Sequence, residues 1–175
     1  MTSISIHCLS ADELDAHADA LAEIMARTVE DGAAIGYMQP FSHTDGLAFF
    51  TGQVFPEVRA GRRRLLVAGL DGKTVGSVQL ITVLPPNQPH RCEVAKMMVH
   101  PSARRKGVGR ALMQALDAEA RAAGKTLVTL DTKTGDKAEP LYRAAGFQTA
   151  GVIPCYALDP DGKAQHATTY MYKAL

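Results

Sequence analysis

The sequence predicts a single α/β domain, residues 1–175, in which helices flank a mixed central β-sheet. Apolar residues make up 46% of the chain and charged residues 21%, which is typical of an ordinary soluble globular protein. The length of 175 residues suits one domain with a sizeable core. Segments with the period of a helix alternate with short β-rich segments, and this alternation indicates a sheet covered by helices.

The first third of the chain predicts one strand, two helices and a loop between the helices. Apolar and polar side chains alternate in the first segment, as in a half-buried strand. Ser10, with Glu13 three residues later, forms a capping box, which indicates the start of a helix. A stretch of small and apolar residues with two glycines then predicts a loop. In order, the expected elements are a strand at 3–8, a helix from Ser10 to about 31, a loop at 32–40 and a helix from 44 or 45 to about 60.

The remaining two thirds predict a series of strands interrupted by two helices. Asp71-Gly72, between two β-rich segments, is a hairpin signal. Gly124 and Gly146 follow helical patterns and are expected to end them. The expected elements are strands at 64–69, 74–84 and 92–99, a helix at 107–123, a strand at 126–131, a helix at 136–145, and antiparallel strands at 147–152 and 168–173 joined by a turn at 159–162.

Charge and residue placement argue against several classes of protein. The formal net charge is +1, so the chain lacks a basic field and no nucleic-acid partner is expected. The three cysteines lie far apart with no CxxC pair, so neither a disulfide framework nor a metal site is expected. No apolar run approaches the roughly 18 residues that span a bilayer. The N-terminus lacks the basic and apolar regions of a signal peptide, and we therefore expect a cytoplasmic protein.

Four cations gather where the helix expected at 107–123 begins. A helix N-terminus is already positive, so a cation there is unfavourable by roughly 0.3–1 kcal/mol. The arrangement is explained if an anion normally binds among these groups, and Gly107 and Gly109 let backbone N–H groups approach a phosphate closely. A solvated charged loop with ordinary turn glycines is the alternative. The cations are Arg104, Arg105, Lys106 and Arg110.

Two common phosphate-binding loops fit this segment poorly. The GxxxxGK[ST] pattern of a Walker A loop is absent. A dinucleotide-binding G-x-G-x-x-G/A pattern would place the bulky Leu112 at its third small position. Asp131 lies at about the right distance for that pattern, but residues 101–106 separate the preceding strand from the glycines. A nucleotide-binding domain of either kind is therefore the least favoured interpretation.

The segment 98–109 resembles the acyl-CoA motif of the GCN5-related N-acetyltransferases, the GNAT family. That motif reads [Arg/Gln]-x-x-Gly-x-[Gly/Ala], and Arg104, Gly107 and Gly109 occupy its specified positions. The segment 141–147 is similar to the family's Tyr-x-x-x-Gly-Phe element. The element order matches the family's fold over nearly the whole chain, and the likeness extends to the tabtoxin-resistance acetyltransferases. The resemblance implies a GNAT fold with strands that splay at the acyl-CoA site.

The resemblance also implies that acetyl-CoA is the co-substrate. In the family, the pyrophosphate lies on the loop backbone, which here means the N–H groups of residues 105–110. Pantetheine pairs with the strand before the loop like an added strand. Because adjacent strand residues face opposite ways, one of the two neighbouring methionines is expected in the core. The implied cofactor-binding residues are Met97, Met98, Val99, Arg104, Arg105, Lys106, Gly107, Val108, Gly109 and Arg110.

The reaction implied by the resemblance is attack by a neutral amine on a thioester, and two carboxylates compete to be its base. Asp131 is expected at the carboxyl end of a buried strand, facing a cleft. Alternatively, Asp131 caps the turn that follows. Glu93 is expected on the same strand face as Met97, by two-residue alternation. The N–H group of Met98 is the expected donor to the oxyanion.

Three aromatic or apolar side chains complete the expected site. The resemblance implies that Tyr142 protonates the departing thiolate, and the alternative is an ordinary core tyrosine. Tyr37 and Met38 are expected to line the acceptor pocket, or simply to anchor their loop.

The function that the resemblance implies is transfer of an acetyl group from acetyl-CoA to the primary amine of a small amino-acid-like or toxin molecule. Acetylation of a protein N-terminus or lysine is the alternative within the same class. A non-catalytic CoA-binding regulatory module is an alternative of another class, and the presence of Asp131 and Tyr142 argues against it. Family members pair through their late strands, so the resemblance also suggests a homodimer.

Overall fold

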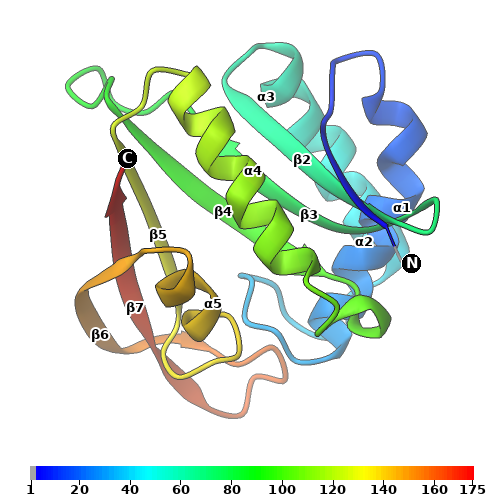
Figure 1. Cartoon of the computed structure of the whole chain (residues 1–175). Helices are drawn as coiled ribbons and strands as arrows, with labels where there is room; N and C mark the ends of the chain where they lie inside the picture. Colours follow the sequence, from blue (N-terminus) through cyan, green and yellow to red (C-terminus); the bar gives the residue numbers. More distant parts are fainter. Residues whose placement is uncertain (1–2) are drawn as a thin grey trace.

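The protein folds into one seven-stranded mixed sheet with strand order β1-β2-β3-β4-β5-β7-β6 (Figure 1). The computed structural model describes residues 3–175. The expected absence of a signal peptide rests partly on Met1 and Thr2, and these two residues lie outside the described part of the chain. The pair β4–β5 is parallel and the other pairs are antiparallel. In chain order, the elements are β1 (Ile4–Cys8), α1 (Leu14–Glu30), α2 (His43–Phe49), the π-helical turn η1 (Phe50–Val54), α3 (Phe55–Arg59), β2 (Arg63–Leu70), β3 (Lys73–Ile81), β4 (Arg91–Val99), the 3-10 turn η2 (Pro101–Ala103), α4 (Val108–Ala122), β5 (Leu127–Lys133), α5 (Glu139–Ala144), β6 (Gln148–Leu158) and β7 (Gln165–Ala174).

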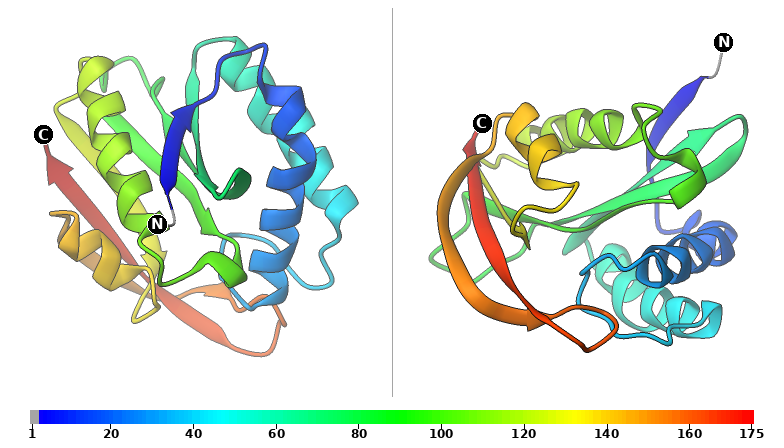
Figure 2. Two further views of the ribbon diagram at one scale, coloured as in Figure 1. Left: turned by 45° about the vertical axis from the view of Figure 1, so that its right-hand side comes forward. Right: turned by 90° about the horizontal axis from the view of Figure 1, so that it is seen from below.

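Helices cover both faces of the sheet, which confirms the predicted fold class (Figure 2). One core lies beneath α4 and α5, where Leu112 and Leu116 pack with the inward side chains of the central strands. A second core lies beneath α1, α2 and α3, where Met25 and Phe50 are fully buried. The helices α1–α3 and α4 therefore lie on opposite faces, and any site between β4 and β5 is reached from both layers.

The two N-terminal helices begin and end differently from the prediction. The hydrogen bonds of the Ser10–Glu13 box form, with Ser10 N–H donating to Glu13 at 2.8 Å, but they close a turn and the helix begins only at Leu14. The second helix begins after Ser42, which shares a capping box with Asp45. It is then broken into α2, η1 and α3, where Pro56 at the start of α3 has no N–H to continue the helical ladder.

An extra residue in β4 forms a β-bulge. Residues Ser77 and Gln79 of β3 pair with Met98 and Ala95, so two steps on β3 match three on β4. Lys96 lies at this bulge in the left-handed region, with φ of 49°. Because of the extra residue, side chains of β4 on the two sides of the bulge no longer follow strict two-residue alternation between the faces of the sheet. The sequence alone does not show this change.

The bulge corrects one predicted placement. Met98 is 1% exposed in the core beneath α1–α3, as expected for one of the two methionines, whereas Met97 packs toward α4. Glu93 pairs with Ile81, which is on the same β3 face as Ser77, the partner of Met98. Glu93 therefore shares a face with Met98, and the prediction that it shares one with Met97 was wrong.

The strands β4 and β5 separate shortly after they meet. Their parallel pairing stops at Glu93 and Thr129. Beyond that point β5 continues to pair with β7 as far as Lys133. Asp131 was expected at the end of its strand, but it lies inside β5 because β7 extends the strand by two residues. The remainder of β4 has no strand beside it on the β5 side, which is the expected splay.

Candidate active site

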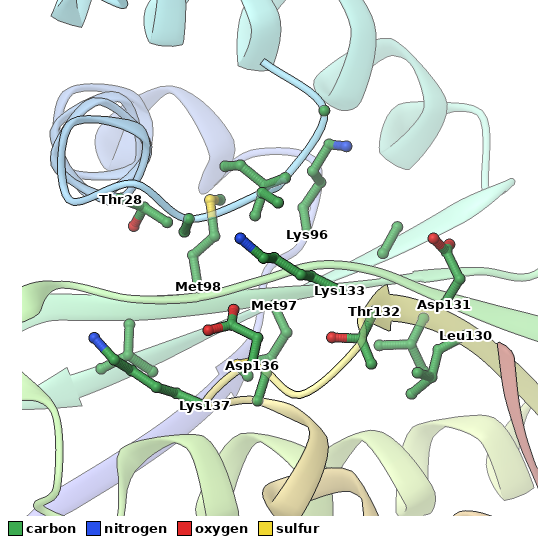
Figure 3. Close-up of a pocket in the computed structure, with 18 of the residues that line it drawn as sticks. Thr28, Lys96, Met97, Met98, Leu130, Asp131, Thr132, Lys133, Asp136 and Lys137 are labelled. Atoms are coloured by element: carbon green, nitrogen blue, oxygen red, sulfur yellow. The ribbon is translucent and has the colours of Figure 1, made fainter. Parts of the chain in front are cut away.

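A cavity of about 1120 Å³ opens where β4 and β5 separate (Figure 3). It extends from the start of α4 to the loop at 33–38 and the β6–β7 hairpin. The structure brings nearly all the predicted site residues to this cavity, and Lys106 alone among them does not line it. Those that do are Tyr37, Met38, Glu93, Met97, Met98, Val99, Arg104, Arg105, Gly107, Val108, Gly109, Arg110, Asp131 and Tyr142.

The free edge of β4 presents main-chain groups to the cavity. The N–H group of His100 donates to Val75 on β3 at 2.8 Å. Because amides in an antiparallel ladder point alternately to one side and the other, the N–H of Met98 points to β3 and those of Met97 and Val99 point to the gap. The gap therefore offers a ladder edge that an extended ligand could complete.

The start of α4 is a concave arrangement of backbone amides. Arg105 and Gly107 both have positive φ, at 60° and 87°, and they curl the chain just before the helix begins at Val108. Within the described residues, the N–H groups of 105–110 donate to no protein acceptor. A Cβ at Gly109 would lie 3.0 Å from Leu141, so only glycine leaves this surface clear. Free amides at a helix N-terminus suit a phosphate, and the residues present fit the pyrophosphate of an acyl-CoA.

The arginine of the predicted motif holds the loop in place. The guanidinium of Arg104 forms an ion pair with Asp31 at the end of α1, and its Nε donates to the carbonyl of Val99 at 3.3 Å. Hydrogen bonding from Arg104 holds the pKa of Asp31 below its usual value. Arg105 and Arg110 also line the cavity, and neither forms an ion pair with a carboxylate of residues 3–175.

Tyr142 lies in the wall of the cavity on the α4 side. The side chain is 6% exposed and its ring packs edge-on against Phe147. Burial raises the pKa of Tyr142 well above its usual value, and the nearby carboxylates Asp131 and Asp136 raise it further. In the described part of the chain the hydroxyl has no hydrogen-bond partner, so it is a protonated donor available to a ligand.

The two candidate bases have different surroundings. Asp131 accepts a hydrogen bond from Thr168 at 3.1 Å and is exposed to the cavity. Glu93 lies 3.3 Å from Arg91, at the last point where β4 and β5 still pair. No backbone N–H among residues 3–175 donates to Asp131, so the alternative role as a turn cap is wrong.

The loop at 33–40 closes the cavity on the side of α1 and α2. Tyr37 packs edge-on against Phe41 and Phe49, with ring centroids 5.0 and 5.5 Å apart. Met38 is 46% exposed, and its methyl group lies close to Gly162 in the β6–β7 turn. The N–H of Gln39 donates to Pro160 at 2.8 Å. The loop and the hairpin are therefore joined, and Tyr37 and Met38 both line the cavity and anchor their loop, while their contact with an acceptor stays a prediction.

Two cations in the cavity were missed by the sequence analysis. Lys96, at the bulge, and Arg63, at the start of β2, both line the cavity, as does the loop at 33–38. Lys96 gives one signal in the sequence, since a lysine interrupts the apolar run of β4, but its direction depends on the bulge. Desolvation by burial lowers the pKa of Lys96 from its usual value.

A splayed parallel strand pair beside a helix start with free amides defines an acyl-CoA-dependent transferase fold. The chain belongs to the GNAT acetyltransferase family, because the family's acetyltransferase (GNAT) domain matches residues 61–149, about half of the chain. Members of this family use acetyl-CoA as co-substrate.

Curated relatives and solved structures agree with this assignment. An IAA acetyltransferase of Azospirillum brasilense is 35% identical over 98 residues, 55% of this chain and 62% of the relative. An uncharacterized N-acetyltransferase from the hisH-hisA intergenic region of the same organism is 32% identical over 115 residues, 64% of this chain and 66% of the relative. The chain thus matches less than two thirds of the length of either relative.

Two solved structures share the whole fold. A ribosomal-protein-alanine N-acetyltransferase from Brucella melitensis superposes with a TM-score of 0.80 at 23% identity, over 98% of this chain and 99% of the other. The putative acetyltransferase yncA from Salmonella typhimurium, solved with its cofactor acetyl-CoA, has a TM-score of 0.78 at 21% identity, over 98% and 94% of the two chains. At these identities the likeness concerns the fold.

The described residues contain neither a candidate metal cluster nor a helix suited to a membrane. Across residues 3–175, no three or more histidine, cysteine, aspartate or glutamate side chains gather in a group that could hold a metal ion. The helices of the same residues are all too short or too polar to cross a membrane.

Proposed function

We propose that the protein transfers the acetyl group of acetyl-CoA to the primary amine of a small amino-acid-like acceptor. The observation that supports this most directly is the set of free amides at residues 105–110, which continues into the open edge of β4. These two surfaces together match a pyrophosphate followed by an extended pantetheine chain.

Acetyl-CoA supplies an acetyl thioester when it is bound. In our proposal the amides of residues 105–110 and the side chains of Arg105 and Arg110 hold the pyrophosphate. The amides of Met97 and Val99 hold the pantetheine and face the thioester. The role of oxyanion donor, which the sequence assigned to Met98, passes to Met97, because ladder alternation points the Met98 amide at β3.

Asp131 is the proposed base for the acceptor ammonium. Its carboxylate is exposed to the cavity, and Thr168 is its one hydrogen-bond partner among residues 3–175. Glu93 is held by Arg91 at the closed end of the splay, so it is better placed to orient the amine than to take its proton. A primary amine is mostly protonated at neutral pH, and a positioned base is therefore required to generate the neutral nucleophile.

Tyr142 is the proposed acid for the departing thiolate. It stands on α5, on the face of the sheet opposite the acceptor loop, and its proton is retained at neutral pH. With an acid and a base on opposite faces of the splay, the departing thiolate would receive a proton on one side while the attacking amine loses its proton on the other.

The acceptor is proposed to be small because the loop at 33–40 and the β6–β7 turn meet over the cavity. An amino-acid-like toxin belongs to this size class. A protein N-terminus or lysine would have to pass beneath that joined wall. The solved relative from Brucella melitensis is named for a ribosomal protein, so peptide acceptors belong in the test.

The proposal is tested by ligand binding followed by an acceptor screen. Acetyl-CoA, NAD and ATP are compared by thermal shift, and stabilisation by acetyl-CoA alone is expected. Free amino acids and short peptides with free N-termini are then screened by release of the CoA thiol. Turnover with an amino acid supports the proposal. Turnover only with peptides would overturn the small acceptor and favour acetylation of proteins. Binding of acetyl-CoA without transfer to any amine would favour a non-catalytic module.

We also propose that the protein forms a homodimer through β6. This strand is one of the two edge strands of the sheet, and it exposes Val152 and Ile153 to solvent. A second copy of the same strand is the proposed occupant, because an edge strand offers an unpaired ladder and apolar side chains at once.

A further inference from the structure

The residue at the β4 bulge is a lysine in an unfavourable backbone conformation. Lys96 has φ of 49°, a region that L-residues other than asparagine and aspartate rarely adopt. When the extra residue of a β-bulge has a positive φ, that residue is usually glycine. The conformation places the side chain of Lys96 on the acceptor side of the sheet, where it reaches toward the loop at 33–38 (Figure 3).

The ammonium of Lys96 has close neighbours but no anionic partner. It lies 5.6 Å from the ring centroid of Tyr37 and beside Gly36, where a Cβ would be 3.4 Å from it. Within the described residues, Lys96 forms neither a hydrogen bond nor an ion pair. A partly buried cation without a partner is unfavourable, and the protein tolerates it where a ligand supplies the opposite charge.

A second cation reinforces the same region. Arg63, on β2, donates to Gln79 at 2.5 Å and is close enough to Lys96 to lower the pKa of that lysine. Its Nε is buried without a partner among residues 3–175. Arg63 is therefore held by Gln79 and adds positive potential near Lys96, whose ammonium has no hydrogen-bond partner among residues 3–175.

The opposite wall of the acceptor region is negative. Asp131 extends from β5 to the same side of the sheet as Lys96, and Glu93 lies on the same face of β4 as Met98 (Figure 3). Asp131 is near enough to influence Lys96 electrostatically, yet the two do not pair. The acceptor region thus presents two cations and two carboxylates, of which Glu93 also pairs with Arg91.

We infer that Lys96, supported by Arg63, is a carboxylate-binding subsite, and that the acceptor is a dipolar molecule such as a free amino acid. Its ammonium lies against Asp131 and Glu93, and its carboxylate accepts hydrogen bonds from the Lys96 ammonium. This inference rests on the proposed function for the identity of the acceptor end of the cavity. Lys96 is assigned here to substrate specificity, with no part in the proton transfers.

The test compares each free amino acid with its own carboxamide. Both members of a pair carry the same amine and side chain, and at about pH 6 both amines are protonated. Binding of the twenty common amino acids and their carboxamides to the full chain saturated with CoA is measured by calorimetry. At least one amino acid is expected to bind about tenfold or more tightly than its carboxamide.

Three variants locate the source of that preference. Lys96→Met is expected to abolish it, and Lys96→Arg to retain part of it. Lys73→Met, at the exposed first position of β3, is the matched control and is expected to retain it fully. CoA affinity within about twofold of the unmodified chain shows that each variant is folded. Because Lys96 is an unpartnered cation, Lys96→Met without ligand is expected to melt no lower than the unmodified chain.

The outcomes separate the subsite from the proposed reaction. Equal binding of acids and carboxamides, or a preference that survives in Lys96→Met, overturns the subsite even if acetyl transfer is observed. A preference lost only in the Lys96 variants, without acetyl transfer to the amino acid that binds, supports the subsite and overturns the proposed reaction. Transfer with the same preference in kcat/KM supports both.

Discussion

Tyr142 shows how burial prepares a single side chain for chemistry. Its hydroxyl is removed from water, and two carboxylates disfavour its anion, so its proton is retained beyond the ordinary tyrosine pKa of about 10. Among residues 3–175 the hydroxyl has no hydrogen-bond partner, and it is not one of their fully buried unpaired polar atoms. We assign the acid role to this residue because a hydroxyl that keeps its proton can donate a hydrogen bond to the departing sulfur as negative charge develops there.

Tyr142→Phe is expected to lower kcat by about 100-fold and to leave the affinity for acetyl-CoA nearly unchanged. The ring still packs against Phe147, so the fold is retained. Steady-state kinetics and calorimetry measure the two quantities. Tyr172→Phe removes an exposed hydroxyl on β7 that bonds only to Gln148 and is the matched control. Unchanged turnover in Tyr142→Phe would reject the acid role.

A pair of isosteric substitutions distinguishes the proposed roles of the Asp131 and Glu93 carboxylates. Asp131→Asn is expected to reduce kcat/KM by about 100-fold or more, because the amide cannot take the acceptor's proton. Glu93→Gln is expected to raise KM with a smaller effect on kcat, since Glu93 only orients the amine. The pH dependence of kcat/KM is measured for both. The reverse pattern would make Glu93 the base.

At the scale of elements, the proposed acetyl-CoA site depends on the β4–α4 connection. The strand leaves its outer edge unpaired, the loop curls through two positive φ values, and the helix begins with free amides. Arg104 ties this loop to the end of α1 through Asp31. The motif arginine therefore contributes to the site by fixing the loop's shape.

Gly109→Glu is expected to abolish acetyl-CoA binding, with a loss of affinity of about 100-fold or more. The new side chain meets Leu141 and brings a carboxylate to the amides that would face the pyrophosphate. Glutamate is a better helix former than glycine, so a folded protein is expected. Gly52→Glu, where a Cβ meets nothing within 4 Å, is the control. Undiminished acetyl-CoA affinity in Gly109→Glu, measured by calorimetry, would show that the pyrophosphate binds elsewhere.

The elements were predictable where their signals are local. Helical periodicity and the glycines at 107 and 109 are visible in the sequence, and so the order of elements and the anion site were predicted from them. The end of β5 and the extent of β6 depend on pairing with β7, which lies far along the chain. The bulge at Lys96 depends on how β4 pairs with β3, which the sequence does not show. The placement of Lys96 in the cavity was missed for that reason.

At the scale of the whole molecule, the two helical layers explain how one cavity could serve the two proposed substrates. The layer with α4 and α5 provides the helix start and Tyr142, while the layer with α1–α3 provides the loop at 33–40. The splay between β4 and β5 joins them through the sheet. The co-substrate and the acceptor would thus enter from opposite faces and meet at the sheet, so neither must leave before the other binds.

The part of the sheet beyond β5 is the least covered region of the described chain. Val152 and Ile153 on β6 are 52% and 44% exposed, and β6 pairs with β7 along one edge only. The chain irregularity between Ile153 and Ala157 shortens the regular edge available for pairing. Contact between two copies is therefore expected to depend on these apolar side chains more than on an extended ladder.

The double variant Val152→Asp with Ile153→Asp is expected to convert a dimer into a monomer. Charges at the centre of an apolar self-contact repel their copies across the twofold axis, and each is desolvated without a partner. Sedimentation equilibrium of both proteins measures the mass directly. Val83→Asp changes an equally exposed valine, in the segment after β3, and is expected to leave the dimer intact. A monomeric mass for the unmodified chain, or an unchanged dimer in the double variant, would exclude β6 as the interface.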